Sequence, residues 1–258
     1  MQSLVAPGSQ AEQVGRLLLA GILVVMLPAL PFGNYLIYPF VILTTWFHEM
    51  GHGLTALLLG QQFQQLMIYS TGSGVAVNAI DRDASVFVPA AIAAGGPLAP
   101  SLVGAGLIMA SAHRKLWRPT LWGVAAAIMV SVIVYVRSVV GFTVLPLVAA
   151  TLAVIAWKAP DGLARFMLQF LGVIAAMSMI ADFNYLFTEV AVIGGQQIRS
   201  DTGQIEEALM LPHWVWAILL LTASALMIGA SLKYALSEDR LRPPPPKRPA
   251  NVLQFKRD

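Results

Sequence analysis

Residues 44–60, TTWFHEMGHGLTALLLG, place two histidines and a glutamate inside an apolar segment that carries no other charged residue. If the segment is helical, each residue advances about 100° around the axis. His48 and His52 then lie about 40° apart, and Glu49 lies about 60° from His52. The three side chains therefore share one sector. This is the HExxH arrangement, in which two imidazoles bind zinc and the glutamate acts as a general base.

The composition of the whole chain indicates a membrane protein. Of its 258 residues, 57% are hydrophobic and only 11% are charged, and the mean hydropathy is +0.72. Soluble domains average about 25% charged residues, so this chain has too few polar residues to cover a soluble surface. Cysteine is absent, which excludes disulfides and thiolate metal ligands.

Long uncharged runs predict helices that cross a bilayer, since each crossing takes about 20 apolar residues. The expected passes are 15–33, 35–60, 85–111, 119–136, 138–157, 165–188 and 210–233. The first run is alternatively a re-entrant hairpin with the second. We therefore predict an all-α polytopic membrane domain of six to seven helices over 1–236, followed by a basic, Pro-rich cytoplasmic tail at 237–258.

The distribution of Lys and Arg predicts the orientation of these helices. The loop HRKLWR at 113–118 and the tail after Leu232 are both basic and should both be cytoplasmic. Four predicted passes lie between them, an even number, so the two assignments agree. The segment 189–207, with four acidic residues and one basic residue, is then an outer loop. We expect a multi-pass protein of the bacterial inner membrane with a cytoplasmic C-terminus.

A catalytic zinc ion takes three protein ligands and leaves one position open. Because cysteine is absent and the other histidines fall near predicted helix ends, a carboxylate is the favoured third ligand. Outside the predicted outer loops, the tail and the N-terminus, Asp161 and Asp182 remain. His52 and Asp182 lie equally far along passes that both run outward (35 to 52 and 165 to 182), so Asp182 is the predicted ligand. Asp161, in a Pro-Asp-Gly turn, should lie at the cytoplasmic interface.

The segment HEMGHGLTALLLG at 48–60 resembles the metal-binding helix of the M50, or site-2-protease-like, membrane metalloproteases, and especially their M50B-like branch. Residues 70–79 resemble that family's Gly-rich segment, which is often a β-hairpin beside the active site. Residues 93–108 resemble its Gly-Pro-containing helix. Residues 200–221 resemble a Ser-Asp…Leu-Pro-x-x-Val-Trp stretch near the C-terminus of the branch.

The resemblance also bears on the third ligand. Site-2 proteases proper carry a Leu-Asp-Gly motif, which this chain lacks, and Asp161-Gly162 matches it only in part. The resemblance makes Asp201 a further candidate, although its predicted outer loop places it near water. From the residues alone, Asp182, Asp161 and Asp201 therefore stay open as alternatives, with Asp182 preferred.

The motif and the resemblance together imply a zinc metalloendopeptidase that hydrolyses membrane-associated protein substrates. His48, His52 and Asp182 would hold Zn²⁺, and Glu49 would act as the base. The alternative is a transporter or assembly factor with a structural or inactive metal site. The intact glutamate favours the protease, because a structural site needs no base. The expected partners are a membrane protein substrate, which could pair with the edge of 72–79, and the lipid bilayer, with no nucleic acid.

Overall fold

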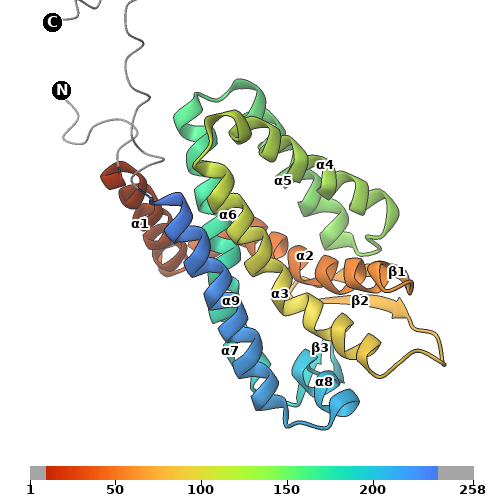
Figure 1. Cartoon of the computed structure of the whole chain (residues 1–258). Coiled ribbons are helices and arrows are strands. Elements are labelled where there is room, and N and C mark those ends of the chain that lie inside the picture. The colour runs from red at the N-terminus through yellow and green to blue at the C-terminus, as the bar shows by residue number, and fades with distance from the viewer. Residues whose placement is uncertain (1–9, 238–258) are drawn as a thin grey trace, which may run out of the picture.

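The computed structural model describes residues 10–237, so the predicted tail at 237–258 lies outside the described residues apart from its first position. Helices make up most of the described chain, and two small antiparallel hairpins complete it (Figure 1). The predicted all-α polytopic architecture, with a small hairpin after the motif helix, is confirmed. The long helices are α1 (Gln10–Met26), α2 (Gly33–Leu58), α3 (Phe87–Ser111), α4 (Trp117–Val134), α5 (Val139–Lys158), α6 (Asp161–Ala181) and α9 (His213–Ala235).

Shorter elements connect these helices. The helical ones are η1 (Leu27–Ala29), η2 (Arg114–Leu116), α7 (Phe183–Leu186) and α8 (Asp201–Leu209). The strands are β1 (Gln62–Ile68), β2 (Gly74–Ala79), β3 (Val190–Ile193) and β4 (Gln196–Arg199). Among the strands of the described residues, β1 pairs with β2 and β3 pairs with β4.

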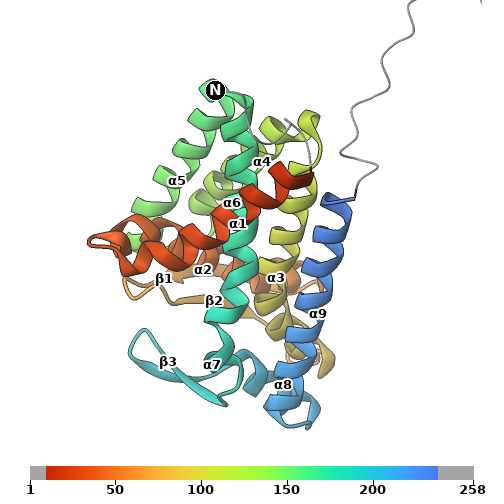
Figure 2. The same cartoon turned by 90° about the vertical axis from the view of Figure 1, so that its left-hand side faces the viewer.

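Within residues 10–237, six helical segments are long and apolar enough to cross a membrane, and they contain α1, α3, α4, α5, α6 and α9. Helix α2, which carries the HExxH motif, is not one of them. It lies crosswise to α3, α6 and α9 in both views (Figures 1 and 2). The predicted pass at 35–60 is therefore a helix, but it does not run alongside the others. The polar side chains of the motif lower the mean hydropathy of α2. They face the protein interior.

Different segments lie at the two ends of the bundle. At one end, Arg114 Nη2 lies 2.5 Å from Asp161 Oδ2, Arg118 Nη1 donates to the carbonyl of Ala156 at 2.6 Å, and His113 Nε2 lies 3.0 Å from the Tyr234 hydroxyl. These contacts join the basic loop, the turn between α5 and α6, and the end of α9. The segments α7, β3 and α8 lie at the opposite end (Figure 2). This arrangement agrees with the grouping that the charge pattern predicts.

Glycines let α2 and α3 cross in close contact. A Cβ on Gly51 would lie 2.3 Å from the carbonyl oxygen of Gly95, and a Cβ on Gly95 would lie 2.2 Å from Oγ1 of Thr55. Gly53 faces the ring of Phe63 on β1, where a Cβ would lie 2.4 Å from Cε1. The glycines beside the two histidines thus allow close packing, as the motif suggests, and they hold the motif helix against α3 and β1.

The hairpin after the motif helix is fixed on one side only. Strand β1 is joined to the connection between α4 and α5, since the N–H of Leu66 donates to Tyr135 and the N–H of Arg137 donates to Leu66, both at 2.9 Å. Strand β2 pairs with β1 through a register that matches Leu66 with Ala76. No other described strand pairs with β2. Its outer edge is therefore open beside the motif helix.

The grouping of the bundle ends predicts the membrane topology. Reporter fusions placed after Arg118 and at the C-terminus should both report the cytoplasm, because these segments share one end of the bundle and carry the basic residues. A fusion near Gln204 should report the opposite side. Activity of paired cytoplasmic and periplasmic reporters would measure this. Opposite readings after Arg118 and at the C-terminus would show that the number of crossings is wrong.

The helix crossing predicts a difference between two glycines of α3. Gly95→Ala should lower the free energy of unfolding by about 1–3 kcal/mol, because the new methyl group overlaps α2. Gly106→Ala is the matched control, since a Cβ there has no neighbour within 4 Å, and it should leave stability unchanged or slightly raised. Thermal unfolding in detergent compares the two variants. Equal stabilities would show that the crossing tolerates a wider separation.

Candidate functional site

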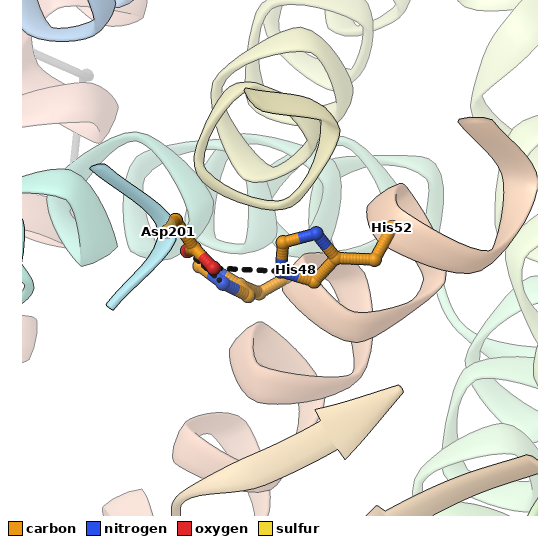
Figure 3. A group of neighbouring side chains, drawn as sticks. All are labelled: His48, His52 and Asp201. Carbon is orange, nitrogen blue, oxygen red and sulfur yellow. Dashed lines mark ion pairs between the residues drawn. The ribbon is translucent and has the colours of Figure 1, made fainter. Parts of the chain in front are cut away.

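Two histidines and one aspartate meet in the protein interior, where α2 faces the first turn of α8. His48 and His52 come from α2, and Asp201 is the first residue of α8 (Figure 3). Nε2 of His48 lies 3.0 Å from Oδ2 of Asp201, and Nε2 of His52 lies 3.3 Å from Oδ1. His52 and Asp201 are only 8% and 2% exposed. One ligand atom from each of the three residues lies within 4.8 Å of the others.

Helix α3 orients the ring of His52. Nδ1 lies 2.7 Å from the carbonyl oxygen of Ile92, which can only accept, so Nδ1 carries a proton and donates it. In the neutral ring, Nε2 is then left with a lone pair that faces Asp201. Gly96 leaves room for this ring, because a Cβ there would lie 2.1 Å from Nε2 of His52. The Gly-Gly-Pro stretch of α3 thus forms one wall of the site.

The first turn of α8 presents Asp201. Ser200 caps the helix, and its Oγ accepts from the N–H of Gly203 at 3.1 Å. Oγ1 of Thr202 donates to the carbonyl of Leu186 at 2.7 Å, which joins this turn to the end of α7. The hydroxyls on both sides of Asp201 therefore bind backbone, and its carboxylate is left to face α2.

The surroundings of Asp201 favour its charged form. Burial by itself raises the pKa of the carboxyl group, but the neighbouring His52 and His48 outweigh burial through their charges and hydrogen bonds, so the pKa lies below its ordinary value. The N-terminus of α8 adds a dipole of the favourable sign. Asp201 consequently offers an anionic oxygen to the cluster.

This arrangement corrects the expectation that Asp201, in the predicted outer segment 189–207, lies near water. The segment folds as the β3–β4 hairpin and α8. Gly194 and Gly195, with φ of +59° and +81°, form the two-residue turn of the hairpin. Asp201, expected near water, is buried. The signal for α8 was present in the sequence, because Ser200 is a good N-cap and an aspartate in the first turn favours a helix start.

The donor set of the cluster fits a zinc ion. Oδ2 of Asp201 is buried and lies 3.0 Å from Nε2 of His48, with no other ion-pair partner in the described part of the chain. The lone pair of a neutral His52 Nε2 also faces this carboxylate, and a cation between the two groups makes that arrangement favourable. Tetrahedral ligands about 2.0–2.1 Å from zinc lie about 3.3 Å apart. The separations of 3.0 Å from His48 to Oδ2 and 3.3 Å from His52 to Oδ1 are close to that spacing.

Glu49 lies beside the cluster and faces β2. It is 6% exposed and forms no ion pair with another residue of 10–237. Gly74, the first residue of β2, passes so close that a Cβ would lie 2.7 Å from Cγ of Glu49 and 2.8 Å from Cγ2 of Thr45. The open strand therefore runs directly past the carboxylate of the motif.

Tyr185 is a site residue that the sequence analysis did not identify. Its hydroxyl accepts from the N–H of Asp201 at 3.2 Å, and its ring centroid lies 6.4 Å from that of His48. It comes from α7, the short helix after Asp182. No pattern in DFNYLF distinguishes this tyrosine from an ordinary packing residue, so only the tertiary structure reveals its position.

Glu49 lies where two cavities meet. The larger, of about 640 Å³, extends among α1, α2, α6 and β3 and reaches His48. The smaller, of about 80 Å³, lies among β2, β4 and α8 and reaches His52 and Asp201. Glu49, His52 and Asp201 are thus buried, and each lines at least one of the two cavities.

Asp182, the predicted third ligand, is not a member of the cluster. It follows α6, is half-buried and lines the larger cavity. The prediction compared depths along two helices that run in the same direction, whereas α2 lies crosswise to α6 (Figure 2). Asp161 pairs with Arg114 and Arg118 instead. The geometry therefore favours Asp201 over both of these aspartates.

The six membrane-type helices and the interior His-His-Asp cluster define a multi-pass membrane protein with a buried polar site, a class that includes membrane peptidases. Residues 17–231 match the Peptidase M50B-like family. Because this match covers most of the chain, the protein belongs to that family, as its resemblance in sequence indicates. It is accordingly an integral, multi-pass membrane protein. Neither a curated protein nor a solved structure matches the chain.

The cluster predicts which aspartate controls metal content. Asp201→Asn should weaken zinc binding strongly, because it replaces the anionic oxygen that faces both imidazoles. Asp182→Asn, the same change on the cavity wall, should retain zinc. His48→Ala and His52→Ala should lose it. Elemental analysis of the purified proteins measures zinc per chain. Retention in Asp201→Asn together with loss in Asp182→Asn would restore the assignment of Asp182.

Proposed function

We propose that this protein is an intramembrane zinc metalloendopeptidase that hydrolyses peptide bonds of membrane-associated proteins. The observation that carries the proposal is the convergence of His48, His52 and Asp201 beside the buried Glu49. Membership of a peptidase family supports the reaction class. When bound by the three residues, zinc would polarise the scissile carbonyl group and make water more acidic.

Glu49 is the proposed general base. Its carboxylate would take a proton from the attacking water and deliver it to the leaving amine. Burial beside His48 and His52, without another ion-pair partner in residues 10–237, leaves this carboxylate available for proton transfer. A purely structural site would need no such group. A buried carboxylate in a membrane protein is costly and is retained mainly for function.

The shape of the site suits an extended substrate. A helical segment hides its amide groups in hydrogen bonds, so a peptide must unwind before hydrolysis. The outer edge of β2 is open beside Glu49 and could pair with an unwound segment. The larger cavity has room for the side chains of such a segment. These features support a membrane protein as the substrate.

The proposal includes the location of the protein. The basic segments at 113–118 and after Leu232 favour a cytoplasmic C-terminus. With this orientation, α8 and the two hairpins face the opposite side of a bacterial inner membrane.

The role of Glu49 is testable without disturbing the metal ligands. Glu49→Gln keeps the size of the side chain but removes its basicity, so zinc should remain while peptide cleavage falls by about 10² or more. The control is Glu207→Gln, the same change at an exposed side chain of α8, which should cleave normally. Cleavage of a model transmembrane peptide in detergent provides the measurement. Normal turnover by Glu49→Gln would refute the proposed mechanism.

A further inference from the structure

The two cavities at Glu49 have lining residues in common. Glu49, Gly74, Tyr185 and Ile193 line both of them. An extended segment that runs from the larger cavity into the smaller one would therefore pass these four residues. The two sides of a scissile bond would lie in different surroundings.

The larger cavity is lined mostly by apolar side chains. They come from helices that belong to the membrane-type bundle and from the motif helix, and include Val24, Ile37, Val41, Ile174 and Met177. Helices α1 and α6, which form two of its walls, are both apolar enough to cross a membrane. This side of the site suits a stretch of apolar residues that comes from the bilayer.

The smaller cavity is more polar than the larger one, although Ile92, Ile193 and Ile198 also line it. Asn78, Gln204 and Asp201 line it together with the backbone of β2. Oδ1 of Asn78 is buried and has no hydrogen-bond partner in the described part of the chain. An unpartnered buried acceptor favours a ligand that brings a donor. The volume of about 80 Å³ holds about five to eight water molecules, at about 10–15 Å³ for each, which suits a small residue next to the scissile bond.

On the basis of the proposed function, we infer that the enzyme cuts its substrate at the junction between an apolar transmembrane segment and a polar segment. The apolar flank occupies the larger cavity. On the other side of the scissile bond, a small residue with a hydrogen-bond donor, such as serine or threonine, occupies the smaller cavity and donates to Asn78. The polar continuation leaves past Gln204, which is exposed on α8.

The first test compares peptides in cleavage assays. In one set, a polar segment that contains Ser begins at the scissile bond, either on its N-terminal or on its C-terminal side. In the other set, apolar residues flank the bond on both sides. Wild-type protein should prefer the first set in kcat/KM. Asn78→Leu, which removes the acceptor at similar size, should reduce that preference by about tenfold. Asn184→Leu is the matched control, since Asn184 is exposed on α7 and lines neither cavity.

The outcomes separate this inference from the proposed function. Equal or faster cleavage of the wholly apolar peptides by wild type would overturn the inference and leave the peptidase assignment intact. An unchanged preference in Asn78→Leu would also overturn it. Cleavage of neither set would count against the peptidase function itself.

A binding measurement remains decisive if Asn78→Leu fails to fold. A photo-crosslinking residue is introduced at Val41 or at Gln204, both exposed at their cavities, in the Glu49→Gln background. Val41 should capture the apolar segment of the mixed peptide, and Gln204 should capture its polar segment. Capture of the same segment from both positions would overturn the inference whether or not any peptide is cleaved.

Discussion

The contact between the Asp201 carboxylate and the two imidazoles of α2 is the interaction on which the rest of the site depends. A buried anion is tolerated only when cationic or donor groups surround it. Here those groups come from a helix more than 140 positions earlier in the chain, so the contact joins the motif helix to α8. The surrounding residues position the groups that make this contact. Gly96 leaves space for one imidazole, and Ser200 and Thr202 fix the turn that presents the carboxylate.

The proposed hydrolysis within a membrane protein requires opposite environments in one place. The reaction needs water and a carboxylate that can accept a proton, while the substrate segment is apolar. The structure meets both needs because α2 lies crosswise to the membrane-type helices (Figures 1 and 2). Its motif residues then face both the apolar cavity beside α1 and α6 and the polar cavity beside α8. A helix parallel to the others would have presented one environment at a given depth.

Sequence patterns identified the long helices well, because each depends on a local run of apolar residues. They also identified His48, Glu49 and His52 as one group, since four residues of helix fix their relative directions. No local pattern identified the third member of the cluster. Choosing Asp182 required the relative tilt of two helices, and no local pattern encodes tilt. The sequence ranks Asp201 below Asp182, because a polar segment between apolar runs normally lies in water. In the structure, the hydroxyl of Thr202 joins this segment to the end of α7.

The sequence by itself determined that this chain is an apolar helical protein with an HExxH helix, because composition and periodicity are local properties. It also determined which residues beside the histidines are glycines, and hence that the motif helix could approach its neighbours closely. Only the tertiary structure decided which carboxylate faces the histidines. It also decided that the hydroxyl of Tyr185 accepts from the N–H of Asp201 and that two unlike cavities meet at Glu49. These depend on how distant helices cross, and crossing is set by the packing of side chains from the whole bundle.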